Sequence, residues 1–243
     1  MPITVQWLGH ACFAIRKDGY TVLIDPYNSD YINGYPKLHV KADKLLISHE
    51  HFGHNYREGV ELSGRPESDC PFEISTLRAP HEFKMGNWRG FTLIHILRAD
   101  GMKLVHMGDL GTQLDGGQIT QLFGADVAMV CAGSCTALPS QEAKRAMDEI
   151  MAKVVVPMHY RHDGMGAHRL ETVEDFANQF ESPELIHRYD TDTLTVTPDL
   201  EPQVAVLRYL GPAGWGDLLP APAPAARRGL FERILHKKQA RSF

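Results

Sequence analysis

Cysteine is scarce in this chain of 243 residues, which contains only Cys12, Cys70, Cys131 and Cys135. Four thiols scattered over this length are too few for a disulfide framework, and such a composition is typical of a reducing compartment. Cys131 and Cys135 have no second close pair with which to complete an all-thiolate zinc site. We therefore interpret the cysteines as small apolar residues.

Long apolar runs are also absent. No segment approaches the roughly 20 apolar residues that a membrane-spanning helix needs. The first residues, MPITVQW, lack the basic, apolar and small-residue zones of a secretory signal. We therefore expect a cytoplasmic protein.

Most of the chain has little positive charge. The net charge is -5, but residues 227–243 hold six Lys or Arg and one Glu, which leaves the rest at 19 - 29 = -10. An acidic body does not attract nucleic acid, so we expect no nucleic-acid partner. The Gly-x-Ser-x-Gly and Gly-rich phosphate-loop patterns are missing as well. Their absence argues against covalent serine hydrolases and nucleotide-binding enzymes.

Short apolar runs predict a strand-rich fold. The first 25 residues predict three short strands with an antiparallel start, at 3–7, 12–16 and 20–24. Later runs indicate strands buried on both faces, at 44–47, 91–97, 103–106, 126–130 and 154–156. Further strands are expected at 185–188, 194–197 and 204–209.

Two segments predict helices. Apolar residues at helical spacing follow Pro139 and Ser140 and predict a helix over 141–152. Thr172 and Asp175 have the spacing of a capping box and predict a second helix over 173–180. Strands covered by helices on their outer faces indicate an α/β layered sandwich.

The C-terminal part changes in composition. We expect a single domain over 1–210, followed by a Pro- and Ala-rich linker over 211–226. Residues 227–243 predict a basic amphipathic tail that is either solvated or in weak contact with an anionic membrane surface or a protein. The sequence does not define the oligomeric state.

Histidines dominate the segment LLISHEHFGHN. His49 and His51 project to one face of an extended chain, and a following turn can return His54 to the same cavity. Three convergent imidazoles after a buried strand are typical of a zinc-type metal site. Other candidate ligands also follow apolar runs, namely His81, His106, Asp109 and His159.

The motifs WLGHACFAI, VLIDPY, SHEHFGH, APHE, LVHMGDLG and VVVPMHY occur in this order between residues 7 and 160, within a resemblance to a known family that covers about residues 3–199. In this respect the sequence resembles the metallo-β-lactamase-fold metal-dependent hydrolases, particularly the branch related to L-ascorbate-6-phosphate lactonase. The resemblance implies a four-layer αβ/βα sandwich. It also implies one metal held by His49, His51 and His81, with Asp109 bridging to a second metal held by His54 and His159.

Further roles follow from the same resemblance. Asp109, His54 and His159 are the expected catalytic residues, and Asp25 is expected to orient a ligating imidazole. His10 and His106 are expected at the edge of the cavity, where a plain structural role is an equal alternative. The family's loop has Asp where this chain has Gly53, so we expect a weakened second metal position that Gly53→Asp would strengthen.

We therefore predict a metal-dependent hydrolase that uses a metal-bound hydroxide on a small, anionic ester, lactone or phosphoester. Zinc is the expected ion, and manganese or iron also suits His and carboxylate ligands, with one or two ions bound. Lys84, Arg161 and His162 are the candidate substrate-binding residues. The alternatives are a non-catalytic metal-binding or sensory protein and a phosphodiesterase acting at an anionic surface.

Overall fold

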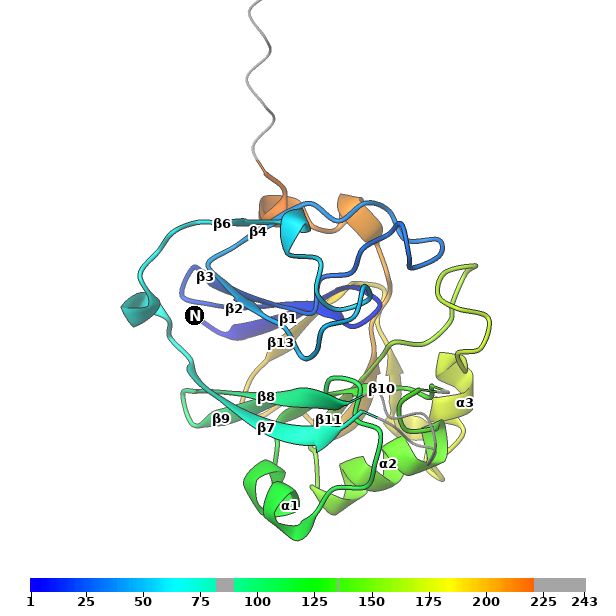
Figure 1. Ribbon diagram of the computed structural model, residues 1–243. Helices are drawn as coiled ribbons and strands as arrows, with labels where there is room; N and C mark the ends of the chain where they lie inside the picture. The colour runs from blue at the N-terminus through cyan, green and yellow to red at the C-terminus, as the bar shows by residue number, and fades with distance from the viewer. Residues whose placement is uncertain (82–89, 135, 221–243) are drawn as a thin grey trace, which may run out of the picture.

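The computed structural model describes residues 1–81, 90–134 and 136–220. The predicted linker residues from 221 on, the predicted tail at 227–243 and the predicted substrate residue Lys84 lie outside these ranges. Two β-sheets pack face to face and form the centre of the molecule (Figure 1). No helix in the described ranges is long and apolar enough to span a membrane.

The first sheet has five strands in the order β13-β1-β2-β3-β5. Its strands are β1 (Ile3–Gly9), β2 (Cys12–Lys17), β3 (Tyr20–Ile24), β5 (Lys44–Leu46) and β13 (Thr193–Val196). Alternate residues face opposite sides, so Trp7 and Phe13 enter the core between the sheets. Cys12, Ala14 and Leu23 enter a second apolar cluster instead. Both faces of this sheet are therefore buried.

The second sheet has seven strands in the order β12-β14-β11-β10-β9-β8-β7. Its strands are β7 (Glu73–Pro80), β8 (Phe91–Ala99), β9 (Met102–His106), β10 (Val127–Cys131), β11 (Val154–Met158), β12 (Ile186–Arg188) and β14 (Gln203–Val206). A separate parallel pair joins β4 (Val40–Ala42) to β6 (Val60–Leu62). The strands β9 to β12 and β14 run parallel, as expected for runs buried on both faces.

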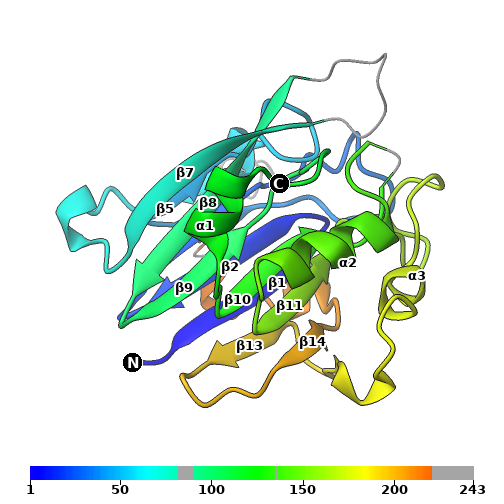
Figure 2. The same ribbon diagram turned by 90° about the horizontal axis from the view of Figure 1, so that it is seen from below.

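Helices cover the outer face of the seven-stranded sheet, as the view from below shows (Figure 2). They are α1 (Gly116–Leu122), α2 (Ser140–Glu149) and, at one end, α3 (Val173–Ala177). In α2 the buried residues Ala143, Ala146 and Met147 recur at helical spacing, which fits the predicted amphipathic pattern. The Thr172 and Asp175 capping box is present at the start of α3. The predicted α/β layered sandwich is confirmed.

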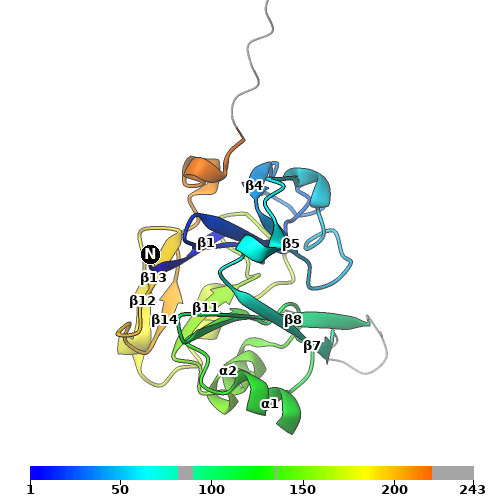
Figure 3. The same cartoon turned by 90° about the vertical axis from the view of Figure 1, so that its left-hand side faces the viewer.

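The outer face of the five-stranded sheet is covered differently. Two 3-10 helices, Gly211–Ala213 and Gly216–Leu218, lie over it beside β4 (Figure 3). Trp215 and Leu218 are each only 2% exposed and belong to the second apolar cluster. The predicted start of the linker at 211 is therefore wrong, because residues 211–218 pack onto the domain.

Other differences are local. Helix α1 and the strands β4, β6 and β7 were not predicted from the sequence. In β7 most side chains are at least partly exposed, so the strand lacks the apolar run that marks a buried one. The helix expected over 173–180 ends earlier, at Ala177.

The topology places the carboxyl ends of several strands, from both sheets, at the same side of the molecule. In the five-stranded sheet β1, β3 and β5 point the same way, and in the seven-stranded sheet β7, β9 and β11 do. The residues that follow these ends are the candidate site residues His10, Asp25, His49, His81, Asp109 and His159. Loops at the carboxyl ends of strands are a common place for chemistry.

Candidate metal centre

Asp109 lies at the middle of a group of imidazoles. Its carboxylate Oδ2 is 4.0 Å from Nε2 of His49, 3.8 Å from Nε2 of His81 and 3.7 Å from Nε2 of His159. Its Oδ1 is 3.5 Å from Nε2 of His54. Two ligands of one tetrahedral zinc ion lie about 3.3 Å apart when each is about 2.0–2.1 Å from the metal. The distances from Asp109 to the four imidazoles are only slightly longer than this, so these side chains are close enough to bind the same ions.

Charge interactions at Asp109 favour its ionised form. Burial acts to raise the pKa of Asp109, but the imidazoles of His54 and His159 outweigh it and lower that pKa well below its usual value. Burial acts to lower the pKa of His54, but the carboxylates of Asp109 and Asp25 raise it to about 10. A buried carboxylate held ionised among imidazoles is a suitable ligand for a divalent cation.

Asp25 orients two of the imidazoles. Nδ1 of His54 lies 2.9 Å from its Oδ2, so His54 donates there and presents Nε2 to Asp109. Ser48 donates its backbone N–H and its hydroxyl to the same carboxylate, and its Oγ is 2.9 Å from Nδ1 of His49. Sequence reasoning anticipated Asp25 but missed Ser48, whose only signal is its place directly before His49.

The orientation of His81 also depends on the backbone. Its Nδ1 lies 3.0 Å from the carbonyl oxygen of Asp109, so His81 donates there and presents Nε2 to the carboxylate. Asp109 follows Gly108, which has φ +55°. A Cβ at Gly108 would lie 2.3 Å from Oγ1 of Thr92, so only glycine lets the loop approach β8 this closely.

Three of the seven non-glycine residues with positive φ in the described ranges lie at the same place. His10, Asp25 and His159 have φ of +52°, +50° and +57°, which is uncommon for residues other than glycine. Each of the three directly follows a strand. Strained residues of this kind persist where the surrounding structure fixes them, and they cluster at functional sites.

The donor set fits a divalent metal. Three groups of residues bring candidate ligand atoms within 4.8 Å of one another: His49, His81 and Asp109; His49, His51 and His54; and His10, His54 and His159. Nε2 of His49, Nε2 of His54 and both ring nitrogens of His10 are buried without a hydrogen-bond partner. Such atoms are costly unless something binds them, and neutral imidazole nitrogen is a good ligand for zinc and similar ions.

Some predicted site residues lie elsewhere. The ring of His106 is bound to the backbone, with Nε2 donating to the carbonyl of Ala11 at 2.9 Å and Nδ1 accepting from Gly108 at 3.2 Å. Arg161 donates to the carbonyl of Leu170 at 3.3 Å. His162 packs against Trp7, and its Nε2 contacts the Tyr35 hydroxyl at 3.0 Å. These contacts give all three side chains structural partners.

The group around Asp109 opens into a cavity of about 170 Å³. Besides His10, His51, His81, Asp109 and His159, its lining includes Tyr31, Ile32, Asn33, Thr136, Ala167, Arg169 and Leu170. His106, Arg161 and His162 do not line it. Tyr31 stacks on Phe52 at 4.0 Å between ring centroids. Sequence reasoning missed Arg169 because only the folded loop brings it to the metal-facing residues.

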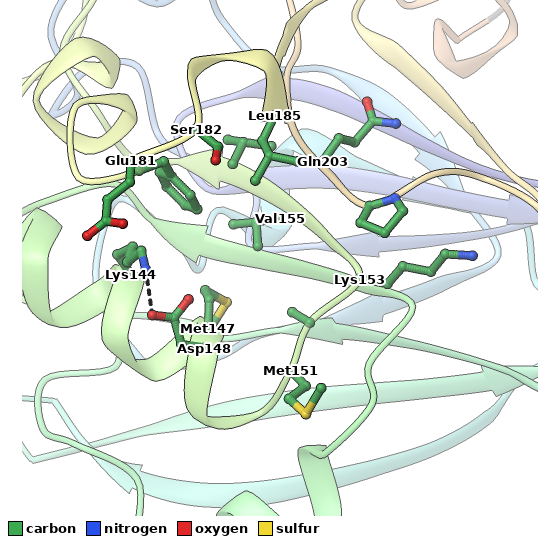
Figure 4. A pocket seen from close by; sticks show the side chains of 14 residues that line it. Lys144, Met147, Asp148, Met151, Lys153, Val155, Glu181, Ser182, Leu185 and Gln203 are labelled. Carbon is green, nitrogen blue, oxygen red and sulfur yellow. Dashed lines mark hydrogen bonds and ion pairs between the residues drawn. The ribbon is translucent and has the colours of Figure 1, made fainter.

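A larger groove of about 690 Å³ lies between α2 and the segments near residues 180–185 and 202–204 (Figure 4). Lys144 and Asp148 form an ion pair of 2.6 Å at its rim, and Met147 and Val155 form part of its floor. None of the three groups of candidate ligands in the described ranges lies there. The smaller cavity is therefore the candidate site.

This fold and site define a class, the metal-dependent hydrolases of the metallo-β-lactamase fold. A model of the beta-lactamase superfamily domain matches residues 4–159 of the chain, which is more than half of it. The chain therefore belongs to the beta-lactamase superfamily.

Individual relatives agree with this assignment. The chain is 26% identical over 194 residues to a UPF0173 metal-dependent hydrolase of Hyperthermus butylicus, with 64% of this chain and 82% of that protein covered. It is similar to a Thermotoga maritima crystal structure described as a candidate Zn-dependent hydrolase of the metallo-β-lactamase superfamily, with 28% identity, a TM-score of 0.63 and coverage of 84% and 98%. A metallo hydrolase of Ignicoccus hospitalis shares the fold at 20% identity, with a TM-score of 0.57 and coverage of 81% and 99%.

Proposed function

We propose that the protein hydrolyses a small anionic ester, lactone or phosphoester in the cavity at Asp109. One or two divalent ions take part in the reaction, and zinc is the first candidate ion. The observation that carries this proposal is the Asp109 carboxylate with four imidazole Nε2 atoms at 3.5–4.0 Å. We assign the binding of the ions to His49, His51, His54, His81, Asp109 and His159. A bound ion would supply Lewis acidity and would lower the pKa of a water molecule bound to it.

The size and lining of the cavity support a small substrate. A volume of about 170 Å³ is below the roughly 300–1,000 Å³ of typical drug-sized sites. Arg169 lines this cavity together with Asn33 and Thr136, which can bind polar groups. A guanidinium forms bidentate hydrogen bonds with a carboxylate or a phosphate. An anionic lactone, as in the L-ascorbate-6-phosphate lactonase branch, is therefore our first candidate substrate.

The proposal is tested with zinc-loaded and chelator-treated protein on matched pairs of anionic and neutral lactones, esters and phosphoesters. We expect turnover by the loaded protein only, with a preference for the anionic member of a pair. Arg169→Ala should raise KM for the anionic member about tenfold or more, because charge-assisted hydrogen bonds contribute roughly 1.5–3 kcal/mol, and should leave the neutral member unchanged.

Arg145→Ala, at an exposed arginine of α2, is the matched control and should change neither constant. Equal losses for the anionic and neutral substrates in Arg169→Ala would contradict the assigned role of Arg169. Metal-independent turnover, or metal binding without turnover of any substrate class, would contradict the proposed hydrolase.

Asp25→Asn is expected to lower zinc affinity by roughly 10- to 100-fold, because it removes the carboxylate to which His54 Nδ1 donates at 2.9 Å. The measurement is competition with a chromophoric chelator. Ser48→Ala removes a neutral hydroxyl that donates to the same carboxylate and also contacts Nδ1 of His49 at 2.9 Å, and it should have a smaller effect because no charge is lost. Equal affinity in Asp25→Asn and the unaltered protein would show that His54 is held by other means.

A further inference from the structure

His10, His54 and His159 form a cluster of three imidazoles on one side of Asp109. Their ring centroids are 4.0 Å apart for His10 and His159, 5.3 Å for His10 and His54, and 5.4 Å for His54 and His159. Each residue offers a ligand atom within 4.8 Å of the others. The three come from the turn after β1, the loop after β5 and the loop after β11, so the fold itself brings them together.

His10 has no role that protein contacts explain. Its side chain is 3% exposed, and neither ring nitrogen has a hydrogen-bond partner. Its backbone is fixed at φ +52°, with the carbonyl accepting from the N–H of His159 and from Nε1 of Trp7, both at 3.0 Å. A strained, buried imidazole without hydrogen-bond partners in the protein is suited to bind a metal ion.

Gly53 makes room for this imidazole. A Cβ placed at residue 53 would lie 2.7 Å from Nε2 of His10 and 3.3 Å from its Cδ2. A side chain at 53 and the ring of His10 therefore compete for one space. The earlier expectation that Gly53 leaves the second position short of a ligand does not take this imidazole into account.

We propose that His10 is the third nitrogen ligand of a second divalent-ion position, together with His54 and His159. Asp109 completes a four-ligand set, since its two oxygens face Nε2 of His54 and Nε2 of His159 at 3.5 and 3.7 Å. This inference rests on the proposed function, of which it defines the second metal position. A set of three imidazoles and one carboxylate favours zinc and similar transition ions over magnesium or calcium.

The test is a titration of the metal-free full-length protein with Zn²⁺, followed by elemental analysis and by the absorption spectrum of the Co²⁺ form. We expect two equivalents in the unaltered protein. His10→Asn should retain the first equivalent of zinc and weaken binding of the second by roughly 100-fold. Removal of an outer-shell partner costs up to about 100-fold in affinity, and loss of a direct ligand should cost at least as much. Asn tolerates the left-handed backbone at residue 10, and His10→Gly serves as a second variant with the same tolerance.

Gly53 provides the complementary variants. Gly53→Asp alone should gain no metal, because its side chain meets the ring of His10. The double variant with His10→Asn and Gly53→Asp should regain the second equivalent, since the new carboxylate enters the vacated space. Gain of a tighter second ion by Gly53→Asp alone would overturn the proposal.

His95→Asn is the matched control, because His95 is also buried and neither of its ring nitrogens has a hydrogen-bond partner. It lies on β8, outside the three ligand groups, and should keep both equivalents. The proposal would be overturned if His10→Asn binds two equivalents of zinc with unchanged affinity, or if the unaltered protein and His10→Asn each bind only one equivalent. These readouts do not use turnover, so a failure to hydrolyse any substrate would count against the proposed function alone.

Discussion

Replacing Asp109 by Asn is expected to lower kcat by roughly a thousandfold or more and to release bound zinc. Asp109 is the carboxylate that four imidazoles face, and the amide of Asn carries no charge with which to bridge two ions. Metal-based stabilisation of a transition state is worth several kcal/mol, and each roughly 1.4 kcal/mol is tenfold in rate. The measurements are turnover of the best substrate from the panel and zinc content per chain.

Asp192→Asn is the control for this variant. Asp192 is also 3% exposed, its carboxylate accepts from Gln6 and Thr193, and it belongs to none of the three groups of candidate ligands in the described ranges. Its replacement should affect thermal stability while leaving zinc content unchanged. If Asp109→Asn keeps its zinc and at least a tenth of its turnover, Asp109 does not bridge the ions and the proposed centre is wrong.

The sequence was most informative where strand ends carry polar residues. His49, His51 and His54 follow β5 within one loop, so an apolar run that ends in polar residues was enough to indicate them. Asp25 directly follows β3 but was expected only from the resemblance to the metallo-β-lactamase-fold hydrolases. The parallel course of β1, β3 and β5 then brings such ends to one edge. This part of the site depends on local pattern and on a simple rule of topology.

The contact between His10 and Gly53 and the place of Arg169 could not be predicted from the sequence, because they depend on how distant segments fold together. His10 and Gly53 are 43 positions apart in the numbering, and only the fold shows that they share one space. Arg169 and Arg161 are both arginines of one loop, yet only Arg169 lines the cavity. Nothing in residue type or spacing distinguishes the two. Which side chain reaches a site is decided by how the loop folds back on the sheets.

The C-terminal boundary was misjudged for a similar reason. The composition of 211–226 is rich in Pro, Ala and Gly, which is typical of a linker. Trp215 and Leu218 nevertheless fill the outer face of the five-stranded sheet, against residues such as Leu8 and Leu23. Two apolar residues in a short segment carry little periodic signal, but burying them completely changes where the domain ends.

A chain that stops after Leu210 is therefore expected to be largely unfolded. It loses Trp215 and Leu218, each 2% exposed, and the carbonyl of Gly214 that accepts from Nε2 of Gln6 at 2.7 Å. Loss of a buried Trp costs about 3–5 kcal/mol and loss of a buried Leu about 2–5 kcal/mol, which together approach the roughly 5–15 kcal/mol by which whole domains are stable. The measurement is the free energy of unfolding in urea.

A chain that stops after Pro220 is the matched control, because it keeps both buried residues and removes only residues outside the described ranges. It should unfold at the same urea concentration as the full chain and bind the same amount of zinc. Trp215→Ala in the full chain isolates the largest contribution and should destabilise by about 3–5 kcal/mol. If the chain ending at Leu210 is as stable as the one ending at Pro220, residues 211–218 only rest on the sheet, and the boundary first expected at 210 is correct.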